Sequence, residues 1–272
     1  MADSDTNISL SFNEALSLLD NASSESLISS HWVPSLQKDI TIKDLTAKQQ
    51  KKLLNAAIDN SSGSFRAFYT KIFYNIIKEN VVGENSFVDN LTYIDRIYLS
   101  LSLRQILSNI LKVQFEDKSF SEVNLSEILG KLKSLSHPSK ESISIIRNSL
   151  NITIDLAPPT FELEVEYFEK MPKFQQKETE VETLKEVLSE SYIYETSKYI
   201  DSIKIAENDL NYKHLNLGQK YTLLEKLPAS VVQKVIEKIA TWKASYEEIL
   251  TISSETGSEK LIEVDSMLFL SV

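Results

Sequence analysis

Hydrophobic and polar residues alternate through the segment VPSLQKDITIKDLTAKQQKKLL and then change to a helical spacing. Ile40 and Ile42 alternate with the polar residues around them, so we expect a half-buried strand over residues 38–43. Trp32 and Val33 begin a partner strand, and Pro34 with Ser35 begins the turn between the two. Thr46, with Gln49 three residues later, has the spacing of a capping box. A helix therefore follows the strand directly, and its predicted buried residues are Leu53, Leu54, Ala57 and Ile58.

Apolar residues recur at intervals of three and four in six further segments, which predicts amphipathic helices. These segments are 65–77, 87–111, 125–135, 179–200, 217–226 and 229–250. Pro228, after Leu227, separates the last two and suits the first turn of the final helix. The first segment carries an aromatic stripe from Phe65 to Phe73, which fits either core packing or a surface for a partner's helix.

Shorter segments alternate with the period of a strand. They are VQFED, SEVNL, NITIDL (151–156), TFELEVEYF (160–168) and IKIA. Pro158 and Pro159 lie between the two longest segments and mark their connection, because proline cannot donate to a strand ladder. The end of the sequence, KLIEVDSMLFLSV, is apolar, and we expect it to be extended and docked onto another surface.

These elements predict an α+β fold, predominantly helical with small antiparallel sheets, in one body with two lobes. A chain of 272 residues is long enough to bury a substantial core. We expect residues 1–30 to form an N-terminal arm that either orders on assembly with a partner or stays loose, 31–158 to form the N-terminal lobe and 159–272 the C-terminal lobe. The boundary falls at the prolines of 157–159 or at the MPKFQQ segment, 171–176.

Composition narrows the classes of function. The net charge of −10 argues against a nucleic-acid partner or an anionic membrane surface and favours basic protein partners. The chain has no cysteine, which excludes disulfides, thiolate nucleophiles and cysteine-bound zinc. No apolar run approaches the ~20 residues that cross a bilayer, so no membrane insertion is expected. The first residues, MADSDTN, lack the character of a secretory signal.

A search for reactive side chains identifies no catalytic, cofactor-binding or metal-ligating residue. His31, His137 and His214 share no metal-binding spacing, although folding could still bring them together. Glycine-rich phosphate loops and nucleophile elbows are absent. Glu162, Glu164 and Glu166 have the spacing of the solvated face of a strand, and the segment from Glu182 to Glu186 that of a solvated helix face. We therefore expect a protein that is not an enzyme and carries no cofactor, with a hydrolase of unrecognised site as the rival hypothesis.

Charged residues interrupt two apolar segments. Arg104 lies between Leu103 and Ile106 and is expected to be partly buried, where it needs a carboxylate or several carbonyls. Asp95 is about 13 Å away along an ideal helix, too far to be its direct partner. Arg104 either belongs to a stabilising network or is presented to a neighbouring subunit. In SKYIDSIKI, Lys198, Asp201 and Lys204 are expected to form a solvated surface set.

Five segments in order give the chain a resemblance to a known family. They are VPSLQKDITIKDLTAKQQKKLLNAA, LTYIDRIYLSLSLRQILS, SKYIDSIKI, LNLGQKYTLLEKLPASVVQKVIEKI and LIEVDSMLFLSV. Over roughly residues 31–272 the chain resembles the baseplate hub-assembly protein family of T4-type contractile-tailed phages, with Asp95, Tyr98 and Arg104 at matching positions. Some relatives carry a cysteine pair where this chain has VQFEDKSFSE, so a metal knuckle is not carried over.

The resemblance implies a non-enzymatic structural or assembly subunit of the baseplate hub. It also implies partners among other hub proteins, a multi-subunit assembly, and a place in the virion tail after assembly in the host cytoplasm. A hub-assembly chaperone absent from the mature particle and an unrelated helical adaptor are the alternatives. The expected protein-contact residues are Asp39, Ile40, Thr41, Ile42, Arg104, Leu268, Phe269 and Leu270.

Overall fold

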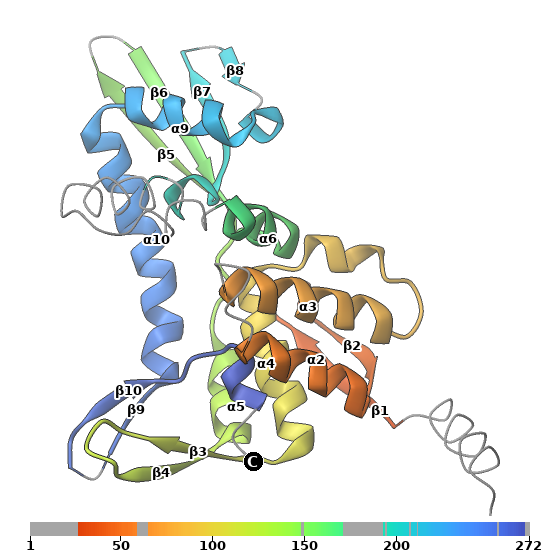
Figure 1. The fold of residues 1–272 in the computed structure, drawn as a ribbon. Coiled ribbons are helices and arrows are strands. Elements are labelled where there is room, and N and C mark those ends of the chain that lie inside the picture. The colour runs from red at the N-terminus through yellow and green to blue at the C-terminus, as the bar shows by residue number, and fades with distance from the viewer. Residues whose placement is uncertain are drawn as a thin grey trace, which may run out of the picture.

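The computed structural model describes residues 27–58, 65–147, 150–170, 193, 195–206, 208–210, 212–254 and 256–269. A helical body occupies the lower part of Figure 1, a four-stranded sheet occupies the upper part, and the long helix α10 runs from one to the other. The predicted α+β class, with helices and small antiparallel sheets, is confirmed. None of the helices in these ranges is long and apolar enough to cross a membrane.

The first hairpin forms as the alternation predicts. Strands β1 (Ile28–Val33) and β2 (Lys38–Lys43) pair antiparallel, and Ile40 and Ile42 face the core while Asp39, Thr41 and Lys43 are exposed. Residues 28–30, which the sequence assigned to the arm, therefore belong to a strand. Residues 1–26 lie outside the described residues.

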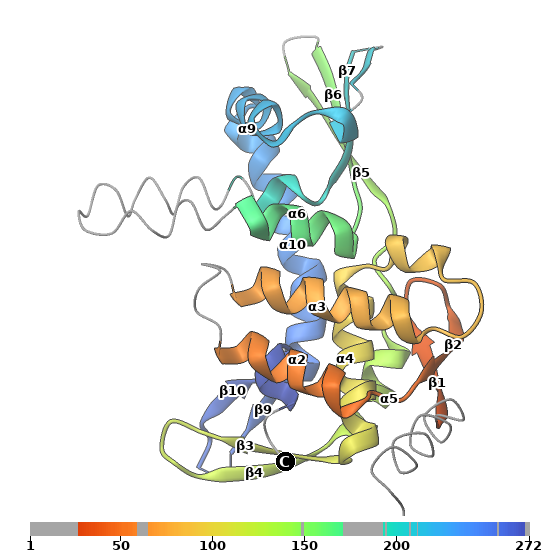
Figure 2. The ribbon, with the colours of Figure 1, turned by 45° about the vertical axis from the view of Figure 1, so that its right-hand side comes forward.

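The capping box at Thr46 is confirmed, because the Gln49 side chain accepts from the Thr46 backbone N–H (3.0 Å) and the Gln49 N–H donates to Thr46 Oγ1 (3.2 Å). Helix α2 (Ala47–Ile58) starts there, and Leu53 is fully buried. Figure 2 shows α2, α3 (Phe65–Asn80) and α6 (Phe161–Lys170) stacked as a layer. The aromatic stripe of α3 enters the core: Phe73 is fully buried, and its ring lies 6.3 Å from that of Phe161.

The helix predicted over 87–111 is wrong at both ends. A short 3-10 helix, η2 (Ser86–Asn90), precedes α4 (Tyr93–Leu107), which starts at a capping box of Thr92 and Asp95. The strand β3 (Ile110–Gln114) takes the last residues of the predicted helix. Helix α4 is buried around most of its circumference, which explains why its apolar residues do not mark its limits.

Two hairpins lie together at the lower end of Figure 1. Strand β3 pairs with β4 (Phe120–Asn124), and helix α5 (Leu125–Ser134) follows, as predicted. The second hairpin pairs β9 (Thr251–Ser253) with β10 (Glu259–Leu261). The two are joined by hydrogen bonds from Lys260 Nζ to the Gln114 carbonyl (2.8 Å) and from Thr256 Oγ1 to the Asp117 carboxylate (2.8 Å).

The largest sheet has the order β5-β6-β7-β8 and is antiparallel throughout. Its strands are β5 (Glu141–Arg147), β6 (Leu150–Leu156), β7 (Ile200–Ile205) and β8 (Asn208–Leu210). The sequence predicted β6 and part of β7 and missed β5. Pairing of β6 with β7 joins segments on either side of the boundary predicted at 158/159, and the division into lobes stays a prediction.

The strand predicted over 160–168 is wrong, because this segment forms helix α6. Thr160 accepts the Leu163 N–H on its hydroxyl (3.3 Å) directly after the two prolines, and Glu162 and Glu164 occupy the first turn. Acidic residues there are favoured by the helix dipole. Phe161, Glu164 and Tyr167, spaced by three, are all buried, so Glu164 is not on a solvated face.

The last helices follow the prediction closely. Helices α9 (Leu217–Lys226) and α10 (Ala229–Leu250) are separated at Leu227 and Pro228, and a short 3-10 helix, η3 (Tyr212–His214), precedes them. The buried stripe of α10 consists of Val231, Val235, Ile239, Trp242, Tyr246 and Leu250. Of the helix predicted over 179–200, residues 179–192 and 194 lie outside the described residues. The solvated helix face predicted from Glu182 to Glu186 falls within this part. Residues 195–197 are helical, and β7 begins at Ile200.

The C-terminal segment docks as predicted but is not extended throughout. After β10 it forms a 3-10 helix, η4 (Ser266–Phe269), which packs against α2 and α4. Leu268 and Phe269 are buried.

Candidate functional site

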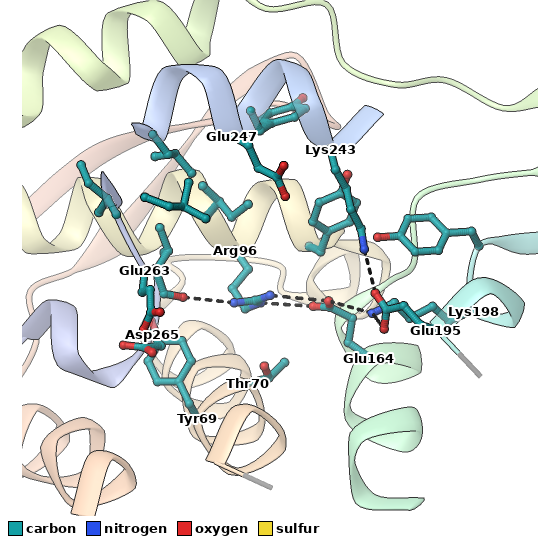
Figure 3. A pocket seen from close by; sticks show the side chains of 18 residues that line it. Tyr69, Thr70, Arg96, Glu164, Glu195, Lys198, Lys243, Glu247, Glu263 and Asp265 are labelled. Atoms are coloured by element: carbon teal, nitrogen blue, oxygen red, sulfur yellow. Dashed lines mark hydrogen bonds and ion pairs between the residues drawn. The ribbon is translucent and has the colours of Figure 1, made fainter. Parts of the chain in front are cut away.

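A cavity of about 300 Å³ lies where the helical layer, α10 and the C-terminal segment meet (Figure 3). Its wall combines residues of α3, α4, α6 and α10 with the segment before β7 and the connection from β10 to η4. The residues that line it are Tyr69, Thr70, Tyr93, Arg96, Ile97, Glu164, Glu195, Lys198, Tyr199, Lys243, Tyr246, Glu247, Leu250, Leu261, Ile262, Glu263, Val264 and Asp265.

A chain of alternating charges crosses this cavity. The Arg96 Nε lies 3.2 Å from a Glu164 carboxylate oxygen, and Lys198 Nζ lies 3.9 Å from the other. Lys198 also pairs with Glu195 at 2.8 Å, and Lys243 pairs with Glu195 at 2.9 Å. The side chains of Glu164 and Lys198 are each only 4% exposed. Two carboxylates thus hold three cations from α4, α10 and the segment before β7.

Burial and pairing act against each other on these groups. Burial is the largest single effect on Arg96 and disfavours its charged form, but Glu164, with smaller contributions from Tyr69 and Tyr199, outweighs burial, so the pKa of Arg96 is raised. Burial would likewise raise the pKa of Glu195, yet Lys198 and Lys243 together hold that pKa below its usual value. A general acid or base needs a pKa near the working pH, so Glu195 is poorly tuned for proton transfer. The arrangement suits fixed ion pairing of chain segments.

Arg96 also reaches the C-terminal segment. Its Nη1 donates to the Val264 carbonyl at 3.4 Å, in addition to its contact with Glu164. One guanidinium from α4 thereby joins α6 to the connection between β10 and η4. Arginine suits such a position because its planar group donates in several directions at once.

Tyrosines form much of the remaining wall. The rings of Tyr93 and Tyr199 meet edge to face with centroids 5.9 Å apart, and Tyr199 lies 6.4 Å from Trp242. Lys198 and Lys243 lie over the Tyr199 ring at 5.6 and 5.5 Å. Burial raises the pKa of both the Tyr93 and Tyr199 hydroxyls, so these phenols stay neutral.

Arg104, the buried cation that the sequence singled out, has carbonyl partners. It is 1% exposed; its Nε donates to the Leu268 carbonyl and its Nη1 to the Ser108 carbonyl, both at 3.0 Å. The prediction that Asp95 is too far away to pair with it is confirmed, because Asp95 instead accepts from Thr92 and from the Ser35 N–H. Of the expected contact residues, Arg104 and Leu268 are therefore brought together within the chain.

The other expected contact residues lie elsewhere. Ile40 and Ile42 are in the core, while Asp39 and Thr41 are exposed on β2. The outer edge of β2 is occupied in part, because Val82 donates its N–H to the Thr41 carbonyl at 2.9 Å. Leu270 lies outside the described residues. A role for these positions in contacts between proteins stays a prediction.

The predicted surface set of Lys198, Asp201 and Lys204 is wrong. Lys198 is buried in the ion-pair chain, Asp201 pairs with Lys140 at 2.6 Å, and Lys204 pairs with Asp209 at 3.5 Å. Sequence reasoning missed the roles of Glu164, Glu195 and Lys243. A helical interpretation of 161–170, favoured by Thr160 after two prolines, would have placed Glu164 on the same face as Phe161 and Tyr167.

The three histidines are dispersed. His31 is buried, and its two ring nitrogens contact the hydroxyls of Ser29 and Ser102, each at 2.7 Å. His137 lies 3.4 Å from the Thr92 hydroxyl, and His214 is exposed in η3. Among the described residues, no three side chains of the metal-ligating types gather in one place.

Comparisons of the chain with protein-family models, with curated proteins and with solved structures found no match.

Proposed function

We propose that this chain is a non-enzymatic structural or assembly subunit of the baseplate hub of a contractile phage tail. The observation that carries the proposal is the spatial arrangement of the five segments on which the family resemblance rests. Segments far apart in the sequence meet in the centre of the molecule, as expected if they form the framework of a common fold.

Specific contacts join these segments. Asp95, in the second segment, accepts from the Ser35 N–H in the first at 2.8 Å. Tyr93, also in the second, contacts Tyr199 of the third. Arg104 donates to the carbonyl of Leu268 in the fifth. The fourth segment ends within helix α10, and Trp242, three residues beyond that end on the same helix, lies against Tyr199.

The surface of the helical body supports a role in protein contacts. Ile106, Leu107 and Ile110, at the end of α4 and the start of β3, are 39–43% exposed, and Phe120 of β4 is 66% exposed. Phe120 lies at the opposite end of the β3–β4 hairpin from Ile110, whereas Ile106, Leu107 and Ile110 are close together in the sequence. Exposed large apolar side chains close to one another are typical of contact sites between proteins. The net charge of −10 favours basic partners.

The test is deletion of the gene in a phage that encodes this chain, followed by complementation in trans. The proposal predicts that hubs fail to assemble without the chain and that mass spectrometry of purified particles detects it in a fixed ratio to other hub proteins. If hubs require the chain but purified particles lack it, the role is that of an assembly chaperone. Normal hubs in the deletion strain would contradict both roles.

A further inference from the structure

In the part of the chain that the structure describes, the four-stranded sheet has one long edge, strand β5, with no paired strand. Among the described residues, β5 pairs only with β6, and its seven residues, Glu141–Arg147, keep a regular register along the whole strand. Such an edge presents a row of backbone groups that can pair with another chain. Natural edge strands are usually short, covered, or interrupted by proline or a bulge.

Two other sheet edges show those protections. Strand β8, at the opposite side of the same sheet, has only three residues. The outer edge of β2 is covered where Ile42 bridges Val81 and where Val82 donates to Thr41. Within the described residues, β5 has a regular register with β6, contains no proline, and has no paired strand on its outer side.

The free backbone groups of β5 can be assigned from the sheet. The Ala206 N–H donates to the Asn151 carbonyl at 2.7 Å, so the backbone of Asn151 faces β7 rather than β5. Along an antiparallel strand pair, opposed residues alternate between two kinds of pair. In one kind the two residues exchange backbone hydrogen bonds, and in the other their N–H and C=O groups point away from each other. Ile146, opposite Asn151, therefore directs its N–H and carbonyl outward, and so do Ser144 and Ser142.

We propose that β5 pairs with β5 of a second copy of this chain, antiparallel and centred on Ser144, to join the two sheets. This register places the outward-facing groups of Ser142 opposite those of Ile146 of the partner subunit, and Ser144 opposite its own equivalent. All three outward-facing residues of each strand are then in hydrogen-bonded pairs. Pairing of identical edges about a two-fold axis is closed, which limits the assembly to a dimer.

Side chains support the same register. The register places position 141 opposite position 147 of the partner subunit, and the sequence has unlike charges, Glu141 and Arg147, at these two positions, which favours the pairing. Glu141 is fixed on the sheet face covered by α10, where Lys238 lies 2.6 Å from one carboxylate oxygen and Trp242 Nε1 contacts the other at 3.4 Å. The Glu141 side chain is 40% exposed, which leaves room for a further cation.

The apolar side chains of β5 are incompletely covered in the single chain. Ile143 and Ile145 pack against the core but remain half-buried. The proposed register sets Ile143 opposite Ile145 of the partner subunit in a non-hydrogen-bonded pair, the kind in which opposed side chains lie closer together. Both side chains therefore become more buried in the dimer. The proposal does not depend on the baseplate role, because it rests on the edge alone.

The experiment is sedimentation equilibrium of the full chain over a concentration series, combined with amide hydrogen exchange at the two ends of that series. The expected result is a monomer–dimer equilibrium in which the amides of Ser142, Ser144 and Ile146 become protected only where the dimer dominates. A chain that stays monomeric, or a dimer without added protection at these amides, overturns the proposal.

Two pairs of variants localise the contact. Ser144→Pro removes an outward N–H, which an edge strand tolerates, and should abolish the dimer, whereas Ser144→Thr should retain it. Arg147→Glu places an acidic residue opposite Glu141 of the partner subunit, and the two-fold symmetry repeats this pair of like charges. This variant should weaken the dimer about tenfold or more, whereas Arg147→Lys should not. If Ser144→Pro fails to fold, the Arg147 pair decides alone. An unchanged dimer in Arg147→Glu contradicts the register.

Discussion

At the scale of the residue, Glu164 is a buried carboxylate that lies between two cations. Its carboxylate is 4% exposed and faces both Arg96 and Lys198. Loss of a buried charge is costly because the opposite charges lose their compensation. We expect Glu164→Gln to lower the free energy of unfolding by about 3 kcal/mol, measured by urea denaturation at neutral pH.

Glu162, on the exposed side of the same helix turn, provides the matched control. Glu162→Gln should change stability by less than about 0.5 kcal/mol. Equal effects of the two substitutions would show that the ion-pair chain does not stabilise the fold.

His31 should make stability depend on pH. Burial lowers the pKa of its imidazole from 6.5 to about 4, against the opposing effects of Asp44 and Asp39. Burial disfavours the protonated, charged imidazole of His31. The folded state is therefore most stable at pH values where this imidazole is neutral in both the folded and the unfolded chain. The unfolded chain takes up a proton below pH 6.5, so stability is full above 6.5 and falls steadily between 6.5 and about 4, by about 3 kcal/mol in total.

The measurement is urea unfolding across this pH range for the wild type and for His31→Gln, whose amide can still contact Ser29 and Ser102. The difference in stability between the two should change with pH in the stated direction, and an NMR titration should show His31 neutral at pH 5. His214→Gln, at an exposed site, serves as the control. A His31 that titrates at its ordinary value would contradict the account.

At the scale of the element, the start of α4 depends on Asp95. This fully buried carboxylate accepts from the Thr92 N–H at 2.6 Å and from the Ser35 N–H in the β1–β2 turn at 2.8 Å. One side chain thus caps the helix and fixes the turn. Asp95→Ala should destabilise the protein by about 2–4 kcal/mol, because the Thr92 N–H, the Thr92 hydroxyl and the Ser35 N–H all lose a charged acceptor.

Glu127, an exposed acidic residue in the first turn of α5, is the comparison for Asp95. Glu127→Ala should cost less than about 1 kcal/mol in thermal or chemical unfolding. If Asp95→Ala were as mild, the carboxylate would not join the helix to the turn.

Element prediction from the sequence succeeded where one face alone is buried. The alternation of Ile40 and Ile42 and the stripe of α10 each match the observed burial. It failed where burial surrounds an element, as in α4, whose apolar residues continue into β3. The apolar residues of segment 160–168 fit both the period of a strand and that of a helix. The segment forms a helix because Thr160 caps its first turn and Phe161 packs into the core.

Strand β5 was missed for a different reason. Its residues ESISIIR alternate for only a few positions, and the strand is fixed by pairing with β6 rather than by its own pattern. Such pairing depends on contacts between segments, which periodicity does not report.

At the scale of the whole molecule, the cavity could not be predicted, because it is assembled from segments up to about 200 residues apart. Arg96, Glu164 and Lys243 each belong to a different helix, and only the fold brings their charges together. Sequence reasoning correctly expected Arg104 to be buried and Leu268 to be docked, but it did not foresee that each is the other's partner.

The central claim is that this chain acts as a subunit of a contractile-tail baseplate hub. The most direct measurement is an electron density map of the intact tail tip of a phage that encodes it. The account predicts density at full occupancy for the four-stranded sheet and the 22-residue helix α10, in contact with other hub proteins. A complete hub at side-chain resolution in which every density belongs to other chains would contradict it.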